Sequence, residues 1–275
     1  MMQLLARLPL AFVHALGVAV AWVIYAFAAK WRARLRANLA QAGYGDARHR
    51  RAAVAEAGKM VFEAPRMWLR PGAELRALIR RVEGMEAVLA ARAAGKGIVF
   101  FTPHYGCFEI TPLVASGHMP LTVLYRPHKK ERLQRVIVEG RERKNIALAP
   151  ASTAGVRMLL AALRRGEAIG ILPDQVPGRG EGEWVEFFGR PAYTMTLAGK
   201  FAAREDCAAF LAMCERLPRG AGYAVRILPL APALPGESPA RRINRALEEA
   251  IRERPEQYMW SYNRYKRPHG APPPP

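Results

Sequence analysis

A run of 22 residues without a formal charge, from Leu8 to Ala29, constrains this chain more than any other feature. A helix of that length rises about 33 Å, which matches the hydrocarbon core of a bilayer. The segment 30–36 that follows holds one lysine and three arginines, whereas Arg7 is the only charged residue before the run. By the positive-inside rule, everything after residue 30 then lies in the cytoplasm. We therefore expect residues 1–30 to form a membrane-anchoring helix.

Two other interpretations of this segment stay open. Ala26-Phe27-Ala28 resembles a signal-peptidase site, which would make the mature protein secreted. The length of the apolar run and the basic cluster directly after the cut oppose cleavage. Pro9, His14 and seven alanines make the run only moderately apolar, so the helix could instead lie in the membrane interface or pack on the rest of the chain. This last interpretation keeps the association with a membrane.

The charge balance predicts a polyanionic partner. The 275 residues include 42 Lys+Arg and 23 Asp+Glu, which gives a formal net charge of +19. Such a surplus suits an anionic membrane, an acidic carrier protein or nucleic acid. Three cysteines without a CxxC pair argue against a disulfide framework and fit a reducing compartment. The histidines and cysteines have no zinc-ligand spacing, so we expect no metal.

Strand and helix patterns alternate in the second part of the chain and predict an α/β fold. Residues 32–94 have helical patterns throughout, and 97–102 is a short apolar run typical of a buried strand. Alternation of this kind favours a mainly parallel central sheet flanked by helices. The other expected strands are 121–127, 146–150, 167–175, 207–217 and 222–230. The other expected helices are 129–145, 152–166, 194–205 and one opening at Ser238-Pro239. We expect 176–194 to be a glycine-rich loop and 271–275 a disordered tail.

His104 directly follows the first expected strand, where ligands of such sheets gather, and Glu109 lies five residues further on. An imidazole there could take a proton from an alcohol if a carboxylate held its second nitrogen, and Glu109 is the candidate for that carboxylate. An H-x4-E spacing also arises often by chance, with the histidine as a cap and the glutamate favouring a helix dipole. Cys107 lies close enough to His104 for a Cys-His nucleophile, although a small buried cysteine is a frequent packing choice.

Further motifs occur in a fixed order around this block. They are Arg36-Ala37-Asn38-Leu39, then His104 with Glu109, Tyr125-Arg126-Pro127, Gly140-Arg141-Glu142-Arg143, Pro173-Asp174-Gln175, Phe187-Phe188-Gly189 and Pro255-Glu256-Gln257-Tyr258-Met259-Trp260. Each motif is weak alone, but together and in this order they are specific. The chain thereby resembles the bacterial lipid A late acyltransferases, relatives of the wider lysophospholipid acyltransferase superfamily, over nearly its whole length.

The resemblance implies transfer of an acyl group from an acyl carrier protein thioester to a hydroxyl of a lipid A precursor, in lipopolysaccharide biosynthesis at the bacterial inner membrane. It implies His104 as general base and Glu109 as its partner, with Arg141 and Asp174 at charged positions needed for activity. Arg126 or Arg141 could donate to the oxyanion or clamp a phosphate. No redox cofactor or metal is implied. Residues 31–270 would form the acyltransferase domain.

Two rival functions remain. An acyltransferase of the same fold could act on a lysophospholipid or an aminolipid, but the glycerol-lipid branch usually carries H-x4-D and a downstream E-G-x-R block, and this chain has Glu109 and no such block. A membrane-tethered nucleic-acid-binding protein would use the positive charge, but no helix-turn-helix, RNP or basic-zipper pattern supports it. Gln175-Val176 and the loop 176–190 depart from the family pattern and leave the acceptor and the acyl length open.

Overall fold

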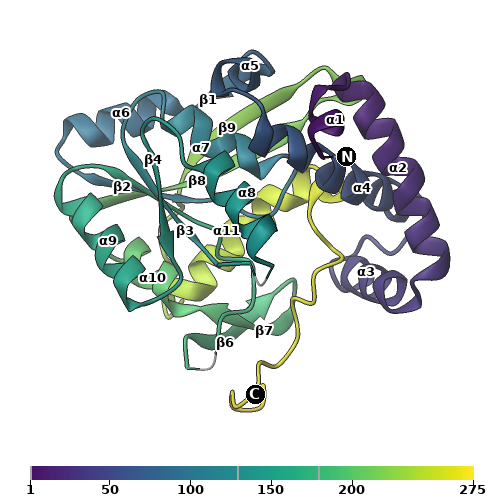
Figure 1. The fold of residues 1–275 in the computed structure, drawn as a ribbon. Coiled ribbons are helices and arrows are strands. Elements are labelled where there is room, and N and C mark those ends of the chain that lie inside the picture. The colour runs from purple at the N-terminus through teal and green to yellow at the C-terminus, as the bar shows by residue number, and fades with distance from the viewer. Residues whose placement is uncertain (1, 129, 179) are drawn as a thin grey trace.

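A sheet of seven strands organises the computed structural model, which describes residues 2–128, 130–178 and 180–275. The strand order is β1-β9-β8-β2-β5-β3-β4, and all neighbours are parallel except β8 and β9. The mainly parallel sheet flanked by helices is therefore confirmed (Figure 1). The strands are β1 (Ile79–Glu83), β2 (Gly97–Phe101), β3 (Leu121–Tyr125), β4 (Ile146–Pro150), β5 (Ala168–Ile171), β8 (Cys207–Arg216) and β9 (Tyr223–Pro229).

Helices cover both faces of the sheet, and four more gather at one side of it (Figure 1). The group at the side holds α1 (Met2–Arg7), α2 (Leu10–Phe27), α3 (Ala29–Gln41) and α4 (Ala47–Leu69). The others are α5 (Gly72–Arg76), α6 (Met85–Ala93), α7 (Thr111–Ala115), α8 (Glu131–Arg141), α9 (Thr153–Arg164), α10 (Thr196–Ala202) and α11 (Pro239–Glu253). Met1, Lys129 and Arg179, which belong to the expected segments 1–30, 129–145 and 176–194, lie outside the described residues.

Strand β2 shows why the sheet needs both helical layers. All five of its residues are buried, because it lies between β5 and β8 in the middle of the sheet. Side chains alternate between the two faces of a strand. Val99 and Phe101 accordingly pack into one core with α9, α10 and α11, whereas Ile98 and Phe100 pack into a second core with α6 and α7.

Two parts of the sequence form strands where the pattern predicted none. Residues 79–83 were expected to continue a helix, but they form β1, an edge strand parallel to β9. Most of β1 is exposed, so its side chains give no alternation, and backbone pairing with β9 holds it instead. Most of the expected loop 176–194 instead forms a hairpin of β6 (Gly182–Phe187) and β7 (Arg190–Met195). Its two-residue turn, Phe188-Gly189, has positive φ at both positions, as tight hairpins require.

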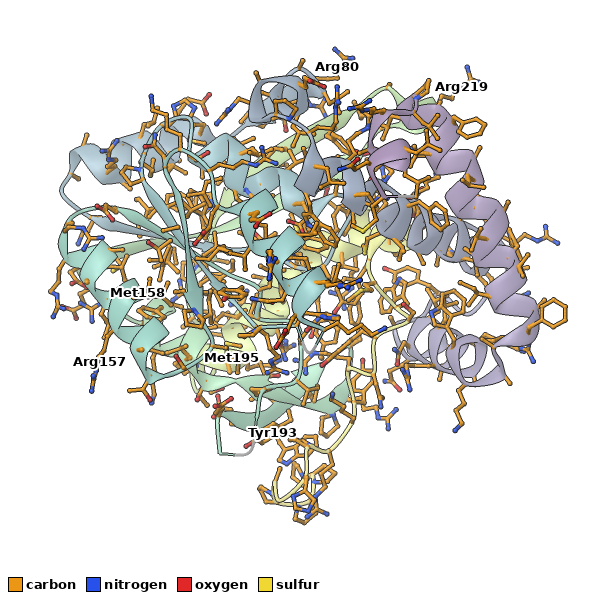
Figure 2. The ribbon with its side chains drawn as sticks, in the orientation of Figure 1. Arg80, Arg157, Met158, Tyr193, Met195 and Arg219 are labelled. Carbon is orange, nitrogen blue, oxygen red and sulfur yellow. The ribbon has the colours of Figure 1, made fainter. Side chains whose placement is uncertain are left out.

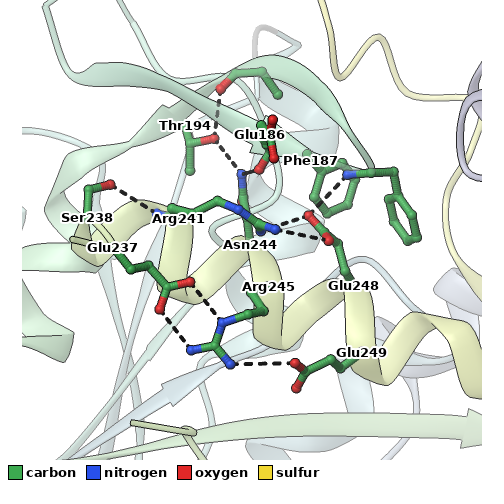
Figure 3. A network of polar contacts seen from close by, with 12 residues as sticks. Glu186, Phe187, Thr194, Glu237, Ser238, Arg241, Asn244, Arg245, Glu248 and Glu249 are labelled. Atoms are coloured by element: carbon green, nitrogen blue, oxygen red, sulfur yellow. Dashed lines mark hydrogen bonds and ion pairs between the residues drawn. The ribbon is translucent and has the colours of Figure 1, made fainter. Parts of the chain in front are cut away.

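Helix α11 holds this hairpin in place. Asn244 on α11 donates from Nδ2 to the carbonyl of Glu186 at 2.8 Å and to the hydroxyl of Thr194 at 3.1 Å (Figure 3). Glu248, one turn further along α11, accepts from the backbone N–H of Phe188 at 3.0 Å. The chain end also contacts the hairpin, because Trp184 donates to the carbonyl of Pro272. Residues 271 and 272 of the tail, for which composition predicts no structure, are thus in contact with the fold, and Ala271 is buried.

Helix α2 is the apolar run of the sequence analysis, and it begins after Pro9 and lies against α4. The two backbones approach so closely at Gly17 that a Cβ there would lie 2.6 Å from the carbonyl oxygen of Gly58. His14 on α2 and Glu63 on α4 form a buried pair with 3.0 Å between Nε2 and Oε2. By length and composition α2 is the one helix of the described residues that could cross a membrane. In this structure it is docked on the domain.

A buried ionic cluster joins this helical group to the sheet. Arg216 on β8 is fully buried and binds Glu56 and Glu63 of α4. The hydroxyl of Tyr223 on β9 also donates to Glu63, at 3.0 Å. Arg216 donates in addition to the carbonyl of Gly106 at 2.8 Å. One guanidinium therefore connects α4, the sheet and the loop that follows β2.

The cluster predicts a specific loss of stability in acid. Burial alone would raise the pKa of Glu63, but the charge of Arg216 and the hydrogen bond with His14 offset it and lower the pKa from 4.5 to about 2. A lowered pKa stabilises the fold fully above pH 4.5, and that stability disappears as the pH falls through about 2. We expect a loss of about 3 kcal/mol from this carboxylate. Urea unfolding across this range measures it, and Glu63→Gln should remove this part of the pH dependence; identical pH profiles for the two proteins would contradict the expectation.

Candidate active site

His104 and Asp174 meet at the carboxyl ends of two neighbouring parallel strands. His104 follows β2, Asp174 follows β5, and these strands pair directly. Oδ1 of Asp174 lies 2.8 Å from Nδ1 of His104, and Oδ2 accepts from the backbone N–H of His104, also at 2.8 Å. The carboxylate is only 2% exposed. It therefore fixes both the ring and the backbone of His104.

The expectation that Glu109 holds the second nitrogen of His104 is wrong in this structure. Glu109 lies in the short 3₁₀ helix η1 (Phe108–Ile110), and its carboxylate accepts from Arg141 and, at 3.1 Å, from the indole N–H of Trp68. The Arg141 contact is bidentate, with Nε 2.9 Å from Oε2. Burial would lower the pKa of Arg141, but Glu109 raises it above its ordinary value. Glu109 and Arg141 are thus brought together as an ion pair beside His104.

The hydrogen bonds assign the proton on the imidazole. Burial alone would raise the pKa of Asp174, but the interactions with His104 outweigh this effect. The net shift of the pKa is downward, so the carboxylate is ionised at neutral pH. An ionised carboxylate only accepts, which places a proton on Nδ1, and in the neutral ring the lone pair is then on Nε2. The side-chain amide of Gln175 lies 3.1 Å from Nε2 and donates to that lone pair. Nε2 is therefore the ring nitrogen that faces away from Asp174 and contacts Gln175.

The C-terminal motif at 255–260 anchors the loop that carries His104. The backbone N–H of Met259 donates to the carbonyl of His104 at 3.0 Å, and Gly106 donates to the carbonyl of Gln257 at 3.0 Å. Gly106 has φ 51°, and a side chain there would collide with the carbonyl of Cys214. Only glycine fits that close approach. Tyr258 and Trp260 are buried, which gives this aromatic segment a structural role.

The other motifs also have structural explanations. Gly140 lies so close to the backbone of Trp68 that a Cβ would overlap it, and this contact brings Arg141 to Glu109. Arg143 donates to the carbonyls of Met67 and Arg70 and so caps the end of α4. Asn38 is the asparagine of the R-x-N-L motif. It donates to the carbonyls of Trp260 and Tyr262, at 2.7 and 2.8 Å, and ties α3 to the C-terminal motif.

An apolar cavity of about 290 Å³, here called the sheet cavity, begins at His104 and extends over one face of the sheet. Its inner wall is formed by residues of β2, β3 and β5, including Phe100, Val123 and Gly170. Arg126, which follows β3, lines the same cavity and is exposed. The structure thus places all five predicted site residues around one cavity, with His104, Glu109, Arg126 and Arg141 lining it and Asp174 buried behind His104.

Cys107 does not have the environment of a nucleophile. It is 2% exposed, and burial raises the pKa of its thiol well above the ordinary value. The thiolate is the reactive form of cysteine, so this environment suppresses it. Its backbone N–H donates to Cys214 across to β8. Packing is the role that the structure supports for Cys107.

Three residues of the site were missed by sequence analysis. Gln175 contacts Nε2 of His104, Trp68 contacts Glu109, and Arg216 holds the carbonyl of Gly106. Gln175 follows Asp174 directly, so its place at a strand end was a usable signal. Trp68 and Arg216 lie in an expected helix and an expected strand, and no local pattern marks them.

The fold and the site define the class of protein. A histidine held by a buried carboxylate opens onto an apolar cavity that suits a hydrocarbon chain, and this arrangement is compatible with an acyltransferase. The model of the family described as bacterial lipid A biosynthesis acyltransferase matches residues 1–267. The chain belongs to this family, and its reaction is an acyl transfer in lipid A biosynthesis.

Named relatives agree with the family. The chain is 29% identical over 217 residues to the lipid A biosynthesis palmitoleoyltransferase of Escherichia coli (strain K12), covering 78% of this chain and 70% of the relative. It is 28% identical over 220 residues to the lauroyltransferase of the same organism, covering 78% and 71%. A lipid A biosynthesis acyltransferase of Haemophilus influenzae is 29% identical over 181 residues, covering 64% and 56%.

Proposed function

We propose that this chain transfers a fatty acyl group from an acyl carrier protein thioester to a hydroxyl of a lipid A precursor, with His104 as general base. The observation that carries the proposal is the position of Nε2, which faces away from Asp174 and lies where the sheet cavity begins. Family membership supports the lipid A acceptor. No metal or redox cofactor takes part in this chemistry.

The reaction follows from the geometry at His104. The acceptor hydroxyl takes the position on Nε2 that the Gln175 amide occupies, and Nε2 removes its proton as the oxygen attacks the thioester carbon. Asp174 stabilises the imidazolium that forms. When the tetrahedral intermediate collapses, the C–S bond breaks and the imidazolium returns the proton to sulfur. The ester and the free thiol of the carrier protein are the products.

The arginines of the site divide into two roles in this proposal. Arg141 is bound to Glu109 and shapes the wall beside His104. Arg126 is exposed at the sheet cavity and is available to a phosphate of the acceptor or to the oxyanion. The net charge of +19 suits an acidic carrier protein, a phosphorylated acceptor and an anionic leaflet together.

The proposed location is the cytoplasmic face of the bacterial inner membrane, with α2 lying in the plane of the interface. The outer side of α2 is apolar and exposed, for example at Phe12, Val23 and Phe27. If α2 crossed the bilayer in its docked position, α4 would enter with it and bring charges such as Lys59 into hydrocarbon. An in-plane helix avoids this cost. Arg219 precedes Gly220, which packs against Ala11 at one end of α2, and its side chain is exposed (Figure 2). Lys30 at the other end is exposed as well, and both cations suit anionic headgroups.

Membranes that contain the chain, supplied with labelled acyl carrier protein thioesters of several chain lengths, test the proposal. The acceptors are a lipid A precursor, a lysophospholipid and an ornithine-type lipid, and mass spectrometry measures the products. We expect one acyl mass to be added to the lipid A precursor, and no addition with the control variant His104→Ala. Addition to another lipid would keep the mechanism and replace the acceptor. Absence of transfer to every acceptor from every thioester would reject the proposal.

A further inference from the structure

A second apolar cavity meets the sheet cavity at His104. It has a volume of about 490 Å³ and lies beside α1 and α4; we call it the α1–α4 cavity. Both cavities are lined by Met67, His104, Phe108, Glu109, Arg141 and Gln175. The base of the proposed reaction therefore lies in the wall that the two cavities share.

The α1–α4 cavity opens on the side of the molecule that carries the exposed apolar helix. Leu5 of α1 and Val61 of α4 line it, and Val61 is 66% exposed. Leu4, the neighbour of Leu5 on α1, is 65% exposed. Helix α2 also packs on α4, so its apolar outer side belongs to the same helical group (Figure 1). Exposed apolar side chains grouped on one side of a molecule mark an interaction site, and hydrocarbon is a partner that fits them.

The chemistry of the transfer requires two separate routes for hydrocarbon. In the tetrahedral intermediate the acceptor oxygen is bonded to the acyl carbon, so the two substrates are joined at this bond beside Nε2. Their chains must leave that point in different directions. The sheet cavity extends inward between strands and helices and suits the single chain of the thioester. The α1–α4 cavity extends from the same point toward the exposed apolar helices.

We propose that the α1–α4 cavity binds an acyl chain of the acceptor lipid, which enters it from the bilayer on which α1 and α2 rest. This inference rests on the proposed function and specifies where its acceptor binds. The hydroxyl of the acceptor reaches Nε2 at the inner end of the cavity, between His104 and the Glu109–Arg141 pair. The hydrocarbon remains in apolar surroundings throughout.

Narrowing the α1–α4 cavity tests this assignment. Ala64 on α4 lines this cavity and not the sheet cavity, so Ala64→Phe fills one and leaves the other open. We expect the KM for the lipid acceptor to rise about fourfold for each methylene displaced, and about tenfold or more in total. The KM for the thioester should change less than about twofold. Ala47→Phe, the same substitution at an exposed site of α4 outside both cavities, is the matched control and should change neither KM.

A second measurement needs no variant. With the wild-type chain and single-chain acceptor analogues that differ by one methylene, the KM should rise about fourfold per methylene removed. A KM independent of acceptor chain length would overturn the assignment, and so would a folded Ala64→Phe variant with an unchanged acceptor KM. A change in thioester chain-length preference in Ala64→Phe would show that the α1–α4 cavity binds the thioester chain, and it would also overturn the assignment. Complete absence of transfer by the wild type would instead count against the proposed function.

Discussion

Replacing Asp174 with asparagine is expected to lower kcat for acyl transfer by about 10²- to 10⁴-fold, close to the loss from replacing His104 with alanine. Asp174 accepts from both Nδ1 and the backbone N–H of His104 through its two oxygens. Asparagine keeps the shape but has one acceptor and an N–H₂ group. It therefore favours the wrong tautomer and removes the charge that stabilises the imidazolium.

The pH dependence of kcat/KM is also expected to change in Asp174→Asn, and the direction of the change follows from the charge of Asp174. The net shift of the pKa of Asp174 is downward because its interaction with His104 offsets the effect of burial, so the carboxylate is ionised throughout the neutral range. Its charge favours the imidazolium. Without that charge, the acid limb of the kcat/KM profile should move to lower pH in Asp174→Asn, while the remaining activity is small. Steady-state rates measured between acid and neutral pH give both the position of the acid limb and the remaining activity.

Glu109→Gln is the matched control, because it makes the same change from carboxylate to amide on the other side of His104. Glu109 binds Arg141 and Trp68 and not the imidazole. We therefore expect its acid limb to stay in place, whatever it loses in rate through the freed Arg141. If Glu109→Gln moved the acid limb and Asp174→Asn did not, the assignment of the two carboxylates would be reversed.

The pairing of these residues shows what the sequence could predict. His104 was recognised because it directly follows an expected strand, and Asp174 was recognised through the family motif at the end of the expected strand 167–175. Their mutual contact could not be recognised, because it depends on β2 and β5 being neighbours although β3 and β4 lie between them in the chain. Glu109 was preferred as the partner because it is close in sequence. The strand order, set by the packing of the whole sheet, decided otherwise.

The fold shows the same division between local and distant causes. Buried runs such as β2, and helices with a serine cap such as α9 and α11, were predicted because the signal lies in adjacent residues. Strand β1 was missed because an exposed edge strand depends on its neighbour β9 for its hydrogen bonds. The docking of α2 on α4 was left open, because the glycines that permit it, Gly17 and Gly58, have meaning only as a pair.

Replacing Arg216 with methionine is expected to cost about 3–5 kcal/mol of unfolding free energy. The guanidinium is the shared partner of Glu56 and Glu63 and is itself fully buried. Methionine fills much of the volume but removes the guanidinium from both carboxylates. Glu56 keeps Lys59, whereas Glu63 is left in the interior with His14 and the hydroxyl of Tyr223, and a buried charge that has lost its cation is costly. Urea unfolding of the folded variant measures the loss. Acyl transfer should fall as well, because Arg216 also holds the carbonyl of Gly106 next to His104.

Arg226→Met on the adjacent strand β9 is the matched control, because it removes the charge of an arginine that is not fully buried. Arg226 pairs with Glu253, and both side chains are partly exposed, so solvent screens the interaction and the expected cost is about 0–1 kcal/mol. Adding Glu63→Gln to Arg216→Met should then cost less than Glu63→Gln alone, because the second change removes a charge that the first has left unpaired. Equal losses for Arg216→Met and Arg226→Met, or strict additivity of the double variant, would show that the cluster at Arg216 does not connect α4 to the sheet energetically.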